Sequence, residues 1–289
     1  IYQDKKPIMK KILIPTDFSK NSSDALFYAE KLYGGKSVEF VVVYSFESEV
    51  SSLTSRVDIG KSEQVVEKLY TEAEEEGALF LKSLKEKLGE THSTFRFIAT
   101  SLEIYRAVNK LIQKEAIELT VMGTKGRSAE ENILMGSTTA KMIQKIKGCP
   151  LLVVPEMNTF EIPSKIGFAT DFTAFFDLAN EGSLKALTQQ FNATWEVIHV
   201  GEAQTLNETQ QDIKKAFKEN LKEIPSFFHE IPLEESVSKS LAIFTEEQRL
   251  DLLCLLNRKH NAIIKLFREP IIKKVGNTTQ VPYLLLPVT

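Results

Sequence analysis

The sequence predicts an α/β protein of two tandem domains, each with a mostly parallel five-stranded sheet and helices on both faces. Three observations support this class. The chain has 289 residues, which suits two domains of about 150 residues better than one. Apolar, strand-like runs alternate along it with segments of helical periodicity, the order typical of α/β folds. The segment KILIPTDFS at 11–19 also returns as KIGFATDFT at 165–173, which indicates an internal duplication.

A second repeated motif marks the end of each half. PLLVVP at 150–155 matches PYLLLP at 282–287, and the offset between the halves falls from 154 residues at the first motif to 132 at the last. The second half therefore lacks about 22 residues, and we expect most of them to correspond to the polar stretch 47–76. The predicted domains are 9–157 and 163–289, joined by a short polar linker that contains Pro.

In the first half, each expected strand is a short run rich in β-branched, aromatic or other apolar residues. Nearly continuous runs of this kind are typical of parallel strands buried on both faces. These strands are 11–15, 38–44, 94–99, 119–122 and 151–154. Between these strands, apolar residues recur at helical spacing. The Glu/Lys-rich run 63–88 suits a helix with a solvated face. These helices are 24–33, 63–88, 102–114 and 137–146.

The second half repeats the same order of elements. Its expected strands are 166–169, 194–200, 226–231, 250–256 and 283–286. Its expected helices are 178–190, 208–222 and 235–248. Helices between successive parallel strands imply right-handed crossovers, so the two sheets should share one topology.

Composition and charge argue against several classes of function. The net charge of −3 supplies no positive field for nucleic acid or an anionic membrane. No apolar run approaches the roughly 18 residues that span a bilayer, and residues 1–10 lack the apolar core of a signal peptide. Cys149 and Cys254 form no CxxC pair and lie in or beside apolar runs, as in reducing compartments. We therefore expect a cytoplasmic protein that binds neither nucleic acid nor membrane.

The most informative stretch is GTKGRSAEENILMGS at 123–137, between an expected strand and an expected helix. Glycine lets a ligand approach the backbone closely, and a helix that begins at Gly136-Ser137 presents free N–H groups and partial positive charge to a phosphate. The hydroxyls of Ser137 and Thr138 can donate to phosphate oxygens. Alternatively, the glycines are turn residues and Ser137 is an N-cap. The stretch is neither a P-loop nor a Gly-x-Gly-x-x-Gly motif after the first strand.

Asp17 follows the first expected strand, at the carboxyl edge where open α/β sheets bind ligands. Its carboxylate can accept hydrogen bonds from ribose hydroxyls or the adenine amino group. Alternatively, Asp17 or Ser19 caps the next helix. Chemistry alone leaves both interpretations open.

No catalytic set and no protein metal site stand out. The four histidines lack metal-ligand spacing, and no nucleophile elbow is present. Glu130 and Glu131 can interact with a phosphate-bound Mg²⁺, although a polar surface explains them as well.

These motifs together resemble the universal stress protein family. Gly123-x2-Gly126-x9-Gly136-Ser137 has the spacing of that family's ATP-binding loop, and 15–19 and 149–155 resemble its first and last strands. The resemblance covers the first half and, more weakly, the second. It implies a tandem protein of Rossmann-like, adenine nucleotide alpha hydrolase-like domains that binds ATP, with or without Mg²⁺, and pairs through its last strands.

Residue by residue, the resemblance and the loop chemistry predict one nucleotide site. Val43 enters only because it matches a position whose backbone contacts adenine in the family. The predicted contacts are Pro15, Thr16, Asp17, Val43, Met122, Gly123, Gly126, Arg127, Gly136, Ser137 and Thr138.

The second half departs from the loop pattern. Aligning 119–122 with 253–256 places Asn257, His260 and Pro270 at the three glycine positions. Side chains would fill the phosphate position and proline lacks an N–H donor, so we expect no ordinary ATP site there. The basic segment 258–274 fits a solvated face, a rescued anion site or a partner surface.

Three functions remain. The first is a nucleotide-binding regulatory or stress protein with one site in the first half, and the retained glycines favour it. The second is a nucleotide-independent scaffold. The third is a slow ATPase. The sequence shows no catalytic base and no Walker lysine, which argues against this function. We also expect 151–154 and 283–286 to pair in an intramolecular pseudo-dimer, with a homodimer through another face compatible with the sequence.

Overall fold

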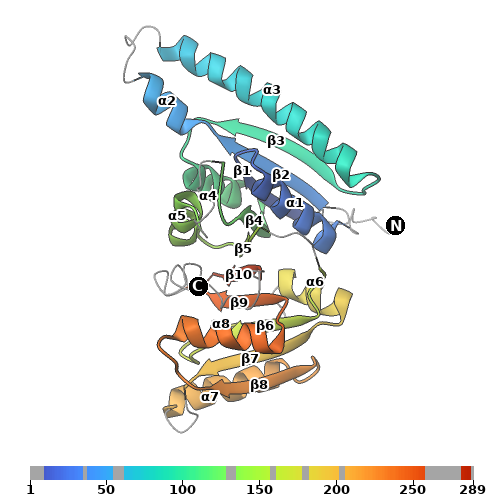
Figure 1. Cartoon of the computed structure of the whole chain (residues 1–289), viewed down its shortest axis with the longest axis vertical. Helices are drawn as coiled ribbons and strands as arrows, with labels where there is room; N and C mark the ends of the chain where they lie inside the picture. The colour runs from blue at the N-terminus through green and yellow to red at the C-terminus, as the bar shows by residue number, and fades with distance from the viewer. Residues whose placement is uncertain are drawn as a thin grey trace, which may run out of the picture. The chain divides into compact units, whose positions relative to one another are not determined.

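A computed structural model describes residues 10–34, 38–54, 62–127, 135–156, 161–177, 182–201, 206–257 and 281–287. Contacts divide the chain into two compact units, 1–149 and 150–289 (Figure 1). None of the helices in these described ranges is long and apolar enough to cross a membrane.

The first unit holds parallel strands in the order β3-β2-β1-β4. The strands are β1 (Lys10–Thr16), β2 (Val38–Ser45), β3 (Thr94–Thr100) and β4 (Leu119–Gly123). The helices are α1 (Lys20–Tyr33), α2 (Glu47–Thr54), α3 (Ser62–Leu88), α4 (Ile104–Glu115) and α5 (Ser137–Lys145). Figure 1 shows α3 running alongside β3.

The core of the first unit explains the continuous apolar runs. The side chains of Ile12, Leu13 and Ile14 are all fully buried, and so are those of 41–43 in β2. Neighbouring residues of a strand point to opposite faces, so both faces of this sheet are covered, as the Val/Ile/Leu pattern predicts.

The second unit begins with β5, which pairs antiparallel with β10 through Val153 and Tyr283. Its order is β5-β10-β9-β6-β7-β8, and the pairs β10–β9, β9–β6, β6–β7 and β7–β8 are parallel. The strands are β5 (Leu151–Val154), β6 (Lys165–Ala169), β7 (Thr194–Val200), β8 (Ser226–Ile231), β9 (Leu252–Leu256) and β10 (Tyr283–Leu286). The helices are α6 (Gly182–Phe191), α7 (Glu208–Asn220) and α8 (Val237–Gln248). The two closing strands thus meet within this unit.

The repeated Thr-Asp-Phe motif encodes one turn, used in both units. The N–H of Phe18 donates to the Thr16 hydroxyl over 2.9 Å, and Phe172 repeats this bond to Thr170 over 3.0 Å. Both phenylalanines adopt positive φ, 61° and 53°. Because a left-handed backbone is uncommon for a non-glycine residue, its presence in both copies shows that the motif sets the turn that follows the first strand of each half.

Two expectations need correction. Residues 47–54 form the helix α2, where we expected only a polar stretch; Val50 of α2 packs against a cluster of Phe46 and Leu69, which supplies stability that local sequence does not. The alignment of the halves was also shifted by one residue. β1 pairs Ile12 with Leu119, whereas β6 pairs Ile166 with Leu252.

This register has a consequence for the glycine loop. Leu252 corresponds to Leu119, so Leu256 rather than Asn257 corresponds to Gly123. The other two positions, where we placed His260 and Pro270, lie outside the described residues, as does nearly all of the basic segment 258–274. Glycine is therefore absent from the first loop position of the second half in either alignment.

Candidate functional site

The candidate site is a cleft of about 780 Å³ at the carboxyl ends of β1, β2 and β4 in the first unit. In the order β3-β2-β1-β4, successive strands are added on one side of β1 up to β3 and then on its other side with β4. Open α/β sheets bind ligands at this switch point, between β1 and β4. Nine of the eleven predicted contacts line this cleft. They are Pro15, Thr16, Asp17, Met122, Gly123, Gly126, Arg127, Ser137 and Thr138.

Two predicted contacts are not among the described residues that line the cleft. The side chain of Val43 is fully buried in β2, where it pairs with Pro15 and Ile98. Gly136 is the N-cap of α5, and its N–H donates to the Thr124 carbonyl over 2.8 Å. That N–H is therefore already used inside the loop.

Two side chains from the β1–α1 segment hold the loop in place. Asn21 Oδ1 accepts a hydrogen bond from the N–H of Lys125 over 3.0 Å and lies 3.4 Å from the Thr124 hydroxyl. The Asp17 carboxylate accepts one from the N–H of Arg127. These bonds join segments about a hundred residues apart and fix the backbone of the loop against α1.

The same side chains explain why glycine stands at 123 and 126. A Cβ at Gly123 would lie 2.4 Å from Asn21 Oδ1, and one at Gly126 would lie 2.4 Å from Asp17 Oδ2. Neither glycine is among the described residues with positive φ, so close approach rather than backbone conformation requires them. At Gly136 the nearest atom to a Cβ is 3.5 Å away, an ordinary contact.

Asp17 and Ser19 both have structural partners. Ser19 is the N-cap of α1, and its side chain accepts a hydrogen bond from the N–H of Ser22. Asp17 Oδ1 accepts a hydrogen bond from the N–H of Ser19 over 3.1 Å, while Oδ2 accepts the one from Arg127. Each carboxylate oxygen offers two lone pairs, so both keep capacity for a further donor from a ligand.

The Tyr44 ring lines the cleft, and Phe18 packs against it from outside the lining. The ring of Phe18 lies 4.6 Å from that of Tyr44, centroid to centroid, and the Tyr44 hydroxyl donates to Glu49 over 2.7 Å. Burial, followed by the hydrogen bond to Glu49, raises the pKa of Tyr44 above its ordinary value. Arg127 forms an ion pair with Glu76 of α3 over 3.0 Å. Tyr44 and Glu49 of α2 thus border the cleft together, and Glu76 of α3 holds the side chain of Arg127.

Another part of the lining joins the beginning of α4 to α5. Glu103, at the N-cap position of α4, makes no side-chain capping bond and forms an ion pair with Lys141 of α5. The hydrogen bond to Lys141 lowers the pKa of Glu103, and the same bond raises the pKa of Lys141. Thr139 donates to the Gly123 carbonyl over 3.0 Å and so attaches α5 to the end of β4.

Sequence reasoning missed Tyr44, Glu103 and Lys141, which line the cleft, and Asn21, which holds the loop beside it. Lys141 follows Ser137 by four residues and therefore shares a helix face with it, a signal that was available. The other three are brought in by the packing of distant elements and carry no local signal.

The carboxyl edge of the second unit is arranged differently. His199 of β7 follows the strand position that pairs with Ala169, and its Nδ1 lies 3.1 Å from the Thr170 carbonyl oxygen. Gln210 of α7 donates to the Asp171 carbonyl over 2.8 Å. The buried ring of Phe217 packs against Phe172 beneath them. Side chains of α7 and β7 thus fix the turn that corresponds to Thr16–Phe18.

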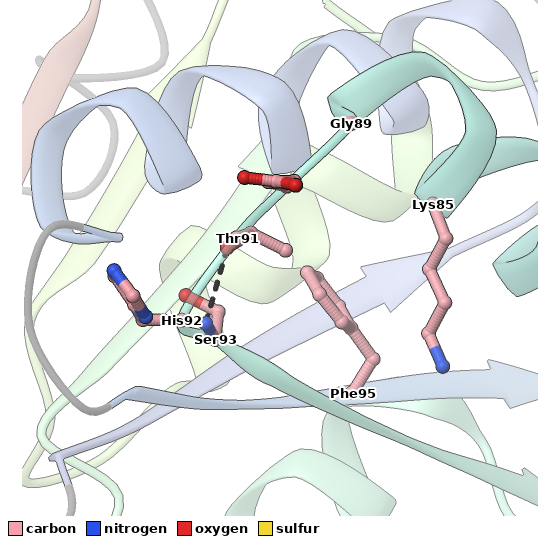
Figure 2. Close-up of a pocket in the computed structure, with 7 residues that line it drawn as sticks. Lys85, Gly89, Thr91, His92, Ser93 and Phe95 are labelled. Carbon is pink, nitrogen blue, oxygen red and sulfur yellow. Dashed lines mark hydrogen bonds between the residues drawn. The ribbon is translucent and has the colours of Figure 1, made fainter.

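A second depression of the first unit lies at the amino end of β3, the edge opposite the cleft (Figure 2). The N–H of Ser93 donates to the Thr91 hydroxyl over 3.1 Å, the bond drawn in Figure 2. Both hydroxyls in turn donate to Glu30 of α1. These polar groups hold the turn between α3 and β3 to α1, so the depression is better explained by structure than by a ligand.

Among the described residues, no group of three or more His, Cys, Asp or Glu side chains is arranged to hold a metal ion. Glu130 and Glu131, which we considered near a phosphate-bound Mg²⁺, lie outside the described residues.

Comparisons with known proteins bear on the family and the fold of this chain. The model of the universal stress protein family matches residues 9–155. Universal stress protein MJ0577 of Methanocaldococcus jannaschii is 27% identical over 158 residues, which cover 52% of this chain and 97% of that protein. Universal stress protein YxiE of Bacillus subtilis is 27% identical over 150 residues, which cover 51% and 99%.

A solved structure extends the similarity to both halves. A universal stress protein from Archaeoglobus fulgidus matches with a TM-score of 0.65 and 17% identity, covering 96% of this chain and 98% of that chain. At this identity the likeness shows a shared fold.

Proposed function

Because the chain belongs to the universal stress protein family, we propose that its first half binds ATP, with or without Mg²⁺, and that the bound nucleotide serves regulation rather than catalysis. The support comes from one structural element, the loop that runs from β4 to α5. Its glycines bring the backbone close to β1, and its end presents the N-terminus of α5 to the same cleft.

The phosphate end of the cleft offers suitable donors. Ser137 and Thr138 are exposed in the first turn of α5, where the helix dipole favours negative charge. Lys125, Arg127 and Lys141 also line the cleft. Mg²⁺ commonly binds through substrate phosphates plus one or two carboxylates, so the ion would arrive with the nucleotide.

The base and ribose end is supported by Asp17 and Tyr44. Asp17 keeps lone pairs for a hydroxyl or amino donor, and the Tyr44 ring, which lines the cleft, offers a flat surface for a planar base. Val43 offers only backbone atoms here, since its side chain is buried.

We further propose that the second half binds no ATP in this way and acts as a structural copy. Leu256 stands where Gly123 would be, and Gln210 and His199 occupy the carboxyl edge beside Asp171. The antiparallel pairing of β5 with β10 supports an intramolecular pseudo-dimer of the two halves. A homodimer through another face is a separate proposal that sedimentation of the full chain would test.

Hydrolysis of ATP is the weaker alternative. A general base works best with a pKa near the operating pH. Lys141 lowers the pKa of Glu103, so this carboxylate is not poised as a base. Release of phosphate at a steady rate, lost in Glu103→Gln, would favour the enzyme over the binding protein.

The experiment is calorimetric titration of the purified full chain with ATP, together with mass spectrometry of any nucleotide released on denaturation. We expect saturable binding at one equivalent per chain. Failure to bind adenine nucleotides in both measurements would leave the nucleotide-independent scaffold as the better account.

A further inference from the structure

The ion pair between Glu103 and Lys141 lies within the lining of the cleft, between the beginnings of α4 and α5. Glu103 also lies 3.6 Å from Arg106, measured between Oε2 and Nε. Its carboxylate is therefore held by two cations while it faces the region where phosphates would bind.

Lys141 stands one turn after Ser137 and shares its helix face, so hydroxyl and ammonium groups line the cleft in succession. The Lys141 side chain is 51% exposed and that of Glu103 is 26% exposed. An ion pair this accessible to water contributes little stability, and a long lysine side chain can exchange partners at small cost.

The charges of the cleft make such an exchange consequential. Its described lining carries more carboxylates than cations. The carboxylates are Asp17, Glu47, Glu49 and Glu103, and the cations are Lys125, Arg127 and Lys141. Arg127 is itself paired with Glu76. A nucleotide with several phosphates would meet a negative surface unless it displaced a carboxylate from one of these cations.

We propose that Glu103 and the terminal phosphates of a bound nucleotide compete for Lys141, and that this competition sets the preference of the site for ATP over AMP. The inference rests on the proposed function of the same cleft. Lys141 favours polyphosphates by moving from Glu103 to phosphate, whereas Glu103 limits that preference by holding the lysine and repelling the incoming charge. AMP leaves the pair intact because its single phosphate is bound at Ser137 and the loop.

The test compares the dissociation constants of ATP and AMP, at equal Mg²⁺, for the full chain and three variants. Lys141→Gln should weaken ATP binding about tenfold, the loss of one charge-assisted contact, and leave AMP within about twofold. Glu103→Gln should tighten ATP binding by about threefold or more without changing AMP. Lys145→Gln, at the end of α5 and outside the cleft, is the matched control and should change neither.

A purely structural pair would give different results. If the pair only joined α4 to α5, both variants would shift the melting temperature and would change ATP and AMP affinity in parallel. An unchanged ATP-to-AMP ratio in Lys141→Gln, or weaker ATP binding in Glu103→Gln, overturns the competition. A wild-type chain that binds neither nucleotide overturns the proposed function itself, and with it this selectivity.

Discussion

Replacing Gly126 by alanine should weaken ATP binding while the first half stays folded. The added Cβ would lie 2.4 Å from Asp17 Oδ2, more than about 1 Å inside an optimal contact between heavy atoms. The loop or the carboxylate must therefore move, and the hydrogen bond from the N–H of Arg127 to Asp17 would be strained or lost.

The expected size of the effect follows from that bond. A hydrogen bond to a charged group contributes about 1.5–3 kcal/mol. The variant must restore the wild-type backbone of the loop before it can bind phosphate, and this cost is subtracted from the binding free energy. ATP affinity should therefore fall at least about tenfold, or about 1.4 kcal/mol. Calorimetric titration measures the affinity, and thermal unfolding checks that the variant is folded.

Gly136→Ala is the matched control. Its Cβ would meet Lys125 Cα at 3.5 Å and Gly126 N at 3.7 Å, both ordinary contacts. Its φ of −74° suits alanine, so we expect ATP affinity within about twofold of wild type. Equal affinities in Gly126→Ala and the wild type would refute the close-approach argument. A loss confined to Gly136→Ala would instead show that close approach of the ligand to Gly136, rather than the packing of Gly126 against Asp17, decides the affinity.

Three further predictions follow from the same structure. Asn21→Ala removes the acceptor of the Lys125 N–H and should weaken ATP binding several-fold by titration, with little change if the loop is held by other means. Leu69→Ala, in the cluster with Phe46, should lower the free energy of unfolding by about 2–5 kcal/mol, measured by urea denaturation. A decrease of less than about 0.5 kcal/mol would show that α3 packs loosely against this cluster. Burial raises the pKa of Tyr283, so its contribution to the free energy of unfolding should be complete below the unfolded pKa of about 10 and should decrease as pH rises above that value. Tyr283→Phe should therefore lose less stability at alkaline pH than the wild type. An unchanged dependence of unfolding on pH in this variant would contradict the prediction.

Much of the fold was predictable because its strongest signals are local. The runs 12–14 and 40–43 are apolar and fully buried on both faces, and only strands buried on both sides need such residues. The repeat of Thr-Asp-Phe marked the turn after the first strand of each half, and the structure gives both copies the same bonds. The glycine spacing likewise located the cleft.

The remaining features depend on contacts that no local pattern encodes. α2 is short and rich in Ser and Glu, and its position depends on packing against Phe46 and Leu69. Asn21 reaches the loop across 104 residues of sequence, and Glu103 reaches Lys141 across 38. The one-residue error in aligning the halves arose because two uniformly apolar runs can be aligned in more than one register. In the structure, the pairing of β4 with β1 and of β9 with β6 fixes the register.

Titration of the full chain with ATP tests the central claim most directly, because the number of sites separates the two halves. The account predicts one equivalent per chain, bound at the cleft of the first unit, with the affinity reduced in Gly126→Ala and retained in Gly136→Ala. Two equivalent sites would show that the second half binds nucleotide by another chemistry. A full equivalent still bound with unchanged affinity in Gly126→Ala would refute the role given to the glycine loop, and either result would contradict the assignment.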